Sequence, residues 1–109
     1  MTYTLDSAVE RNREAPDTFP IPSQAERENL RPGQIVKLMF RFDGPGEETV
    51  ERMWVIVKAR TPAGYLGELD NQPYATDALR AGAPVHFGPE HVIALYWERP
   101  KPVGTPGRS

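Results

Sequence analysis

The chain has 109 residues, a net charge of −2 and 12 prolines, and it contains no cysteine. This length holds one domain at most, and the lack of cysteine excludes disulfides, thiolate nucleophiles and cysteine-ligated zinc sites. The net charge provides no general attraction to nucleic acid or to an anionic membrane.

The first residues, MTYTLDSAVERNRE, lack the basic and then apolar order of a secretion signal. No apolar run in the chain is long enough to span a bilayer. The absence of cysteine suits a reducing compartment. We therefore expect a cytoplasmic protein without a membrane-spanning segment.

Residues 1–22 indicate an extended leader, and the sequence leaves open whether this leader is ordered. A single β-rich domain is expected over residues 23–99, followed by a disordered tail over residues 100–109. Ser23 is followed three residues later by Glu26, which is the spacing of a helix capping box. This pattern predicts a short helix over residues 23–30, which ends at the Pro-Gly pair that follows.

The next two segments predict a hairpin. The segment IVKLMFRF, residues 35–42, and the segment TVERMWVIVKAR, residues 49–60, both alternate with the period of a half-buried strand. The segment DGPGEE, residues 43–48, predicts the loop between them. The positions expected to face the core are Val36, Leu38, Phe40, Phe42, Met53, Val55, Val57 and Ala59.

Three shorter segments predict three further strands: YLGELD, PVHF and HVIALYWE. Gly67 in the first of them predicts a bulge or a close backbone approach. The segment DNQPYATDALRAG is irregular, with one helical turn expected at residues 76–80. Together these elements predict a mainly β (α+β) fold: a strongly bent five-stranded antiparallel sheet, or a partly open small barrel, with a short N-terminal helix.

The segment VHFGPEHV contains both histidines, His86 and His91, with Glu90 beside the second. A helical zinc-protease motif places such ligands one turn apart, but Gly88 and Pro89 between the histidines oppose a helix. We interpret this segment as a turn between two strands, with His86 facing outward. The alternatives are a metal site or a general base formed by the histidines and the glutamate.

Other catalytic patterns are absent from the sequence. No serine lies in a glycine elbow, and no glycine-rich phosphate cradle is present. Asp70 and Asn71, followed by Pro73, predict a turn closed by side-chain-to-backbone hydrogen bonds, with an oxygen-rich cation site as the alternative. No metal or cofactor is predicted.

The outward positions of the predicted hairpin form a basic face that contains a tryptophan. Modules that bind single-stranded nucleic acid use cations for phosphates and rings for bases, whereas exposed aromatic residues and arginine are also enriched at protein interfaces. Two further interpretations remain: arginine and lysine stems only cover Trp54 and Ile56, or the leading helix covers this face, with Leu30 packed on it. The outward positions are Ile35, Lys37, Met39, Arg41, Arg52, Trp54, Ile56, Lys58 and Arg60.

Four segments in order, ERMWVIV, GYLGELDNQP, GAPVHF and an apolar strand ending at Trp97, carry a resemblance. From Arg31 to Trp97, the chain resembles a family of small bacterial domains of unknown function, the one numbered 2314. The resemblance implies a compact β-rich module and no particular reaction. It also implies that Trp54 and Trp97 are packing anchors. A ligand pocket formed by tryptophan and Asn71 is the alternative role for these positions.

We therefore predict a non-enzymatic interaction module that binds a protein partner and uses no cofactor. An exposed strip of Trp54, Ile56 and Met39 is the positive reason for this prediction. One alternative is a small barrel that binds single-stranded nucleic acid through Arg52, Trp54 and Lys58, and another is an enzyme or metal site around the two histidines. The predicted binding residues are Lys37, Met39, Arg41, Arg52, Trp54, Ile56, Lys58, Asn71 and Trp97.

Overall fold

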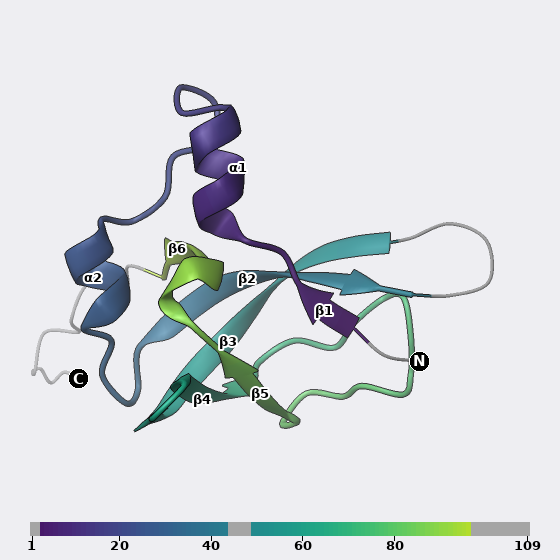
Figure 1. The fold of residues 1–109 in the computed structure, drawn as a ribbon. Helices are drawn as coiled ribbons and strands as arrows, with labels where there is room; N and C mark the ends of the chain where they lie inside the picture. The colour runs from purple at the N-terminus through teal and green to yellow at the C-terminus, as the bar shows by residue number, and fades with distance from the viewer. Residues whose placement is uncertain (1–2, 44–48, 97–109) are drawn as a thin grey trace, which may run out of the picture.

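The computed structural model describes residues 3–43 and 49–96, which fold around one curled antiparallel sheet (Figure 1). The strand order is β1-β2-β3-β4-β5, and β6 pairs with β2. This arrangement confirms the predicted mainly β fold class with a strongly bent antiparallel sheet. The elements are β1 (Tyr3–Leu5), α1 (Ala8–Glu14), α2 (Gln24–Glu28), β2 (Ile35–Phe42), β3 (Thr49–Thr61), β4 (Gly64–Leu69), β5 (Pro84–Phe87), the 3-10 turn η1 (Pro89–His91) and β6 (Val92–Leu95).

Strand β2 has partners on both edges and pairs with three strands. One edge pairs with β3 along its whole length. The other edge is shared by β1, where Leu5 lies opposite Phe40, and by β6, where Leu95 lies opposite Val36. The two segments nearest the ends of the described chain therefore meet on one strand (Figure 1).

The inner face of the sheet forms the main hydrophobic core, because alternate residues of β1 to β5 point into the curl, where Val92 and Leu95 of β6 join them. The predicted inward positions of β2 are confirmed, as are those of β3 up to Val57. Ala59 is only half-buried, and the register of β3 against β4 shifts just before it. The buried residues of this core are Leu30, Val36, Leu38, Phe40, Phe42, Met53, Val55, Val57, Tyr65, Leu69, Val85, Phe87 and Val92.

Gly67 of β4 makes the close backbone approach that its place in the strand predicts. A Cβ atom there would collide with the side chain of Val55 and lie 2.9 Å from the carbonyl oxygen of Ile56. It would also lie 3.2 Å from the ring of Phe87. Glycine is therefore required at this position so that β4 can pack inside the curl.

The leader differs from the extended segment expected for residues 1–22, because it contains β1 and α1. The Ser7 hydroxyl accepts the backbone N–H of Glu10 at 3.1 Å, which caps α1. The same Ser-x-x-Glu spacing begins α2, where the capping box of Ser23 and Glu26 is confirmed. The sequence signal for α1 was therefore present in the leader and equivalent to the one used for α2.

Helix α1 and the segment after it cover one end of the outer face of the sheet (Figure 1). Ala8, Met39 and Ile93 form a second buried cluster there, against which Phe19 and Ile21 pack. Leu30 belongs instead to the main core, so the idea that it packs on the outer face with the second helix is wrong.

The segment between β4 and β5 forms bends, and the helical turn expected at residues 76–80 is not formed. The Glu51 carboxylate of β3 accepts the backbone N–H groups of Tyr74 and Ala75, at 3.0 and 2.6 Å. These bonds attach the segment to the sheet. The two backbone N–H groups therefore have acceptors without a helical turn.

The tail expected over residues 100–109 lies outside the described residues. Within the part of the chain that is described, no helix has the length and apolar character needed to cross a membrane.

Candidate functional site

Trp54 lies on the outer face of β3, directly opposite Lys37 of β2, and its side chain is half-buried. The Lys37 Nζ atom lies 4.6 Å from the centroid of the Trp54 ring, which is the geometry of a cation–π contact. The ring of Tyr96 approaches Trp54 edge to face, with a centroid distance of 5.4 Å and an interplanar angle of 78°. Two aromatic rings and one cation are therefore gathered at one point of the outer face.

A hollow of about 290 Å³ opens beside these rings. The residues that line it are Ile35, Trp54, Asp70 and Tyr96: three apolar or aromatic residues and one acidic residue. Pockets for drug-sized ligands have volumes of roughly 300–1,000 Å³, so this hollow lies just below the lower end of that range.

Residues just after β4 hold Trp54 in place through the backbone. The Trp54 N–H group donates to the Asn71 Oδ1 atom at 2.5 Å, and the Asp70 N–H group donates to the Trp54 carbonyl oxygen at 2.9 Å. The bond predicted here was one that closes the turn, whereas the bond of the Asn71 side chain joins the turn to β3. Asn71 thus positions the tryptophan, and its amide oxygen is already engaged by that backbone N–H.

The basic residues around Trp54 differ in what they contact. Lys58 forms an ion pair with Glu68 of β4, with an N–O distance of 3.4 Å. The Arg52 guanidinium lies 5.7 Å from the centroid of the Phe19 ring. Among the described residues, neither Arg52 nor Lys37 forms an ion pair with a carboxylate.

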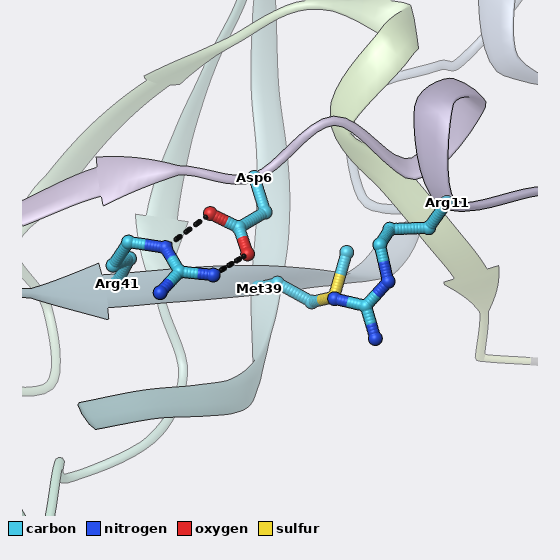
Figure 2. A network of polar contacts seen from close by, with 4 residues as sticks. All are labelled: Asp6, Arg11, Met39 and Arg41. Atoms are coloured by element: carbon cyan, nitrogen blue, oxygen red, sulfur yellow. Dashed lines mark hydrogen bonds and ion pairs between the residues drawn. The ribbon is translucent and has the colours of Figure 1, made fainter. Parts of the chain in front are cut away.

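Two predicted binding residues, Met39 and Arg41, contact the leader and do not line the hollow (Figure 2). Met39 is 1% exposed, with an Nη1 atom of Arg11 at 4.0 Å from its sulfur, so its predicted exposure is wrong. Arg41 forms a bidentate ion pair with Asp6, with contacts of 2.9 and 2.7 Å. Both residues hold the leader on the sheet, and neither lies at the hollow.

The remaining predicted residues are placed as follows. Ile56 is half-buried on the outer face, and Lys37, Arg52 and Lys58 lie on the same face of the sheet. Trp97 lies outside the described residues.

Sequence reasoning missed the contribution of Tyr96 and Asp70 to the site. The alternation expected for the last strand contained a signal for Tyr96, because the residue after an inward Leu95 is expected to face outward. The backbone of Tyr96 is fixed there by a 2.8 Å hydrogen bond from its N–H group to the Ile35 carbonyl oxygen. No comparable signal placed Asp70, because its position depends on how β4 ends against β3.

The histidine segment forms the turn that its sequence predicts. His86 is exposed on β5, and the chain turns through Gly88 into η1 before β6 begins. The Gly88 N–H group donates to the His91 Nδ1 atom at 2.9 Å, so the proton of the neutral ring lies on Nε2. That Nε2 atom is 3.6 Å from a carboxylate oxygen of Glu90.

Burial lowers the pKa of His91 below its ordinary value, and the Glu90 carboxylate opposes this shift. Both groups, together with His86, border a second hollow of about 230 Å³. Over residues 3–43 and 49–96, no group of three or more histidine, aspartate or glutamate side chains is arranged to hold a metal ion. The His91 ring therefore acts in the turn itself, as the acceptor for a buried backbone donor.

Comparisons with protein-family models, with curated proteins and with solved structures gave no match. The relation to the family of small bacterial domains therefore stays a prediction, and the function is inferred from the geometry alone.

Proposed function

We propose that the protein is a non-enzymatic interaction module that binds another protein through the outer face of β3. The observation that carries this proposal is the pair of perpendicular rings, Trp54 and Tyr96, beside a hollow of about 290 Å³. We name this surface the Trp54 face; its residues are Ile35, Lys37, Arg52, Trp54, Ile56, Asp70 and Tyr96.

The composition of the Trp54 face supports a protein partner. Tyr96 is 46% exposed although its ring contacts another aromatic ring. Tryptophan, tyrosine and arginine are the residues that contribute most to binding at protein interfaces. The main core on the opposite side of the sheet is closed without these rings, so their placement on the outside is not required by the core.

Binding of single-stranded nucleic acid is the alternative, and the contact of Lys37 with Trp54 favours it. Two observations oppose it: an acidic residue, Asp70, lines the hollow, and Lys58 is paired with Glu68. A single-strand binder tracks the phosphate backbone with a continuous row of cations. A fluorescence titration with a thymidine oligonucleotide at low and high salt tests this alternative, since such binding weakens steeply as salt rises.

The proposal is tested by affinity capture from the native host with the full chain and two matched variants. Replacing both Trp54 and Tyr96 with alanine removes the rings of the proposed interface. The control, Tyr74→Ala, removes an aromatic side chain that is 98% exposed on the segment after β4. We expect one or more proteins to be captured by the wild type and by the control but lost with the double variant. Identical captured proteins for all three chains would contradict the proposal, provided that thermal melting shows all three to be folded.

A further inference from the structure

We infer that the partner segment is acidic: one apolar side chain enters the hollow, and carboxylates beside it contact Lys37 and Arg52. This inference rests on the proposed function, because it names the chemistry of the partner at the Trp54 face.

The apolar anchor follows from the walls of the hollow. Ile35, Trp54 and Tyr96, an aliphatic and two aromatic residues, line it, and its volume of about 290 Å³ lies below the range for drug-sized ligands. Burying apolar surface against such walls is favourable in proportion to the area removed from water. An aliphatic or aromatic side chain of the partner meets these conditions.

The acidic character follows from two cations of the outer face, Lys37 beside Trp54 and Arg52 beside Phe19. Lys37 and Arg52 lie against aromatic rings and have no carboxylate partner among the described residues, whereas Lys58 and Arg41 on the same face are each paired with one. An interface is specific when potentials of opposite sign meet, and a like charge at the same place is costly. These two cations therefore favour carboxylates on the partner.

Asp70 and Lys37 lie on opposite sides of Trp54, which favours one orientation of the partner segment. Lys37 lies beside Trp54 on the β2 side, while Asp70 follows β4 and lies on the other side of the tryptophan. A carboxylate of the partner is attracted toward β2 and repelled at Asp70. The partner segment is therefore expected to place its acidic residues over Lys37 and Arg52 and a neutral or donor group at Asp70.

Two other candidates for binding at the Trp54 face, the chain's own residues after Tyr96 and a nucleic acid strand, fit these charges less well. The residues after Tyr96 contain Arg99, Lys101 and Arg108 with the single acid Glu98, so this segment has the same sign as the two cations. A nucleic acid strand has the required negative charge, but its phosphates continue past the rings to Asp70, where they are repelled.

The test uses three synthetic peptides added to the full 109-residue chain. One has a central leucine flanked on each side by two glutamates; the second replaces the glutamates with lysines, and the third replaces the leucine with alanine. Binding is followed by the NMR shifts of the Trp54 and Tyr96 amides. We expect the acidic leucine peptide to bind at least several-fold more tightly than either of the others and to weaken as salt is raised.

Charge-removing variants locate the contacts. Lys37→Met and Arg52→Met should each weaken binding of the acidic peptide several-fold, whereas Tyr74→Ala should leave it unchanged. Asp70→Asn should leave the affinity equal or increase it, because it removes a repulsive charge. Equal binding of the lysine peptide, no binding of any peptide, or binding of a thymidine oligonucleotide in place of the acidic peptide would each overturn the inference.

The two proposals fail in different ways. If no peptide binds but the double variant of Trp54 and Tyr96 still loses a captured protein, the acidic chemistry is wrong and the interaction surface stands. If the acidic peptide binds but protein capture is unaffected by the double variant, the proposed function is wrong.

Discussion

The two faces of β3 have the same alternating pattern but different environments. On the inner face, Met53, Val55 and Val57 are at most 3% exposed. On the outer face, Trp54 and Ile56 remain half-buried, although they are as apolar as their inner neighbours. Alternation alone therefore shows that a strand has two faces, but it does not show how completely each face is covered.

The difference arises from what each face meets in the tertiary structure. The inner face lies inside the curl, where β4, β5, β6 and Leu30 surround it. Among the described residues, α1 and the segment after it cover the outer face at the Met39 end. The Trp54 end of the same face lacks such a cover in the described structure.

The largest effect is expected when the inner core is opened. Phe40→Ala removes a fully buried ring, and it should lower the free energy of unfolding by about 3–5 kcal/mol. Trp54→Ala removes a half-buried ring on the outer face and should cost only about 1–2 kcal/mol. Urea denaturation of both variants measures the contrast. If Trp54→Ala is as destabilising as Phe40→Ala, the tryptophan is part of the core in energetic terms, and its role in binding loses support.

A smaller effect is expected when a group is added inside the curl. Gly67→Ala places a methyl group against Val55 and the Ile56 carbonyl, and overpacking of this kind costs about 1–3 kcal/mol. The shift in the urea midpoint measures this cost. A stability equal to that of the wild type would show that β3 and β4 can separate here without loss.

The covered end of the outer face should respond to loss of a helix cap. Ser7→Ala removes the side chain that accepts the Glu10 N–H group, and it should lower stability by about 1 kcal/mol. Hydrogen exchange should then be faster in α1, while the amides of β3 keep their protection. Ser23→Ala is the matched control, because it removes the equivalent cap of α2, a helix without buried residues. Equal effects of both substitutions on α1 would show that α1 does not depend on its own cap.

The smallest effect is expected from pH, through His91. Burial lowers the pKa of this imidazole in the folded protein, so the unfolded chain binds a proton more readily. The contribution of His91 to the stability of the fold is therefore fully present above the pKa of histidine in the unfolded chain, which is about 6.5. This contribution is lost as the pH falls from about 6.5 toward the lower pKa of His91 in the folded protein. The proton also occupies Nδ1, which then no longer accepts the Gly88 N–H group.

Urea midpoints measured from pH 8 down to pH 5 test this expectation, with His91→Gln as the variant that should reduce the slope. His86→Gln is the matched control, because it leaves the contact between Gly88 and His91 intact. A slope that is unchanged in His91→Gln would show that other groups cause the loss of stability at low pH.

Much of the fold was readable from local patterns. The alternation from Val36 to Phe42 and from Met53 to Val57 correctly assigned the inward residues, and the Ser23–Glu26 spacing located α2. The strand β1 was missed because three residues are too short to show a period. Its stability comes from the contacts of Tyr3 and Leu5 with the core, which are made only when β2 is already in place.

The candidate site was less predictable than the fold. Trp54 and Lys37 were placed on one face correctly, since both positions follow from the period of a strand. Met39 follows the same period and was placed with them, but α1 buries it. The hollow itself combines residues from β2, β3, the end of β4 and the end of β6, which are up to 61 positions apart in sequence between Ile35 and Tyr96.

The amino-acid sequence by itself determined where the longer strands β2 and β3 run, which of their side chains from Val36 to Phe42 and from Met53 to Val57 face inward, and where α2 is capped, because these depend on neighbours a few residues apart. Only the tertiary structure decided which part of the outer face is covered. Whether Met39 is buried and Trp54 left half-open depends on where α1 docks and how β4 ends, and those contacts join segments that no local pattern connects.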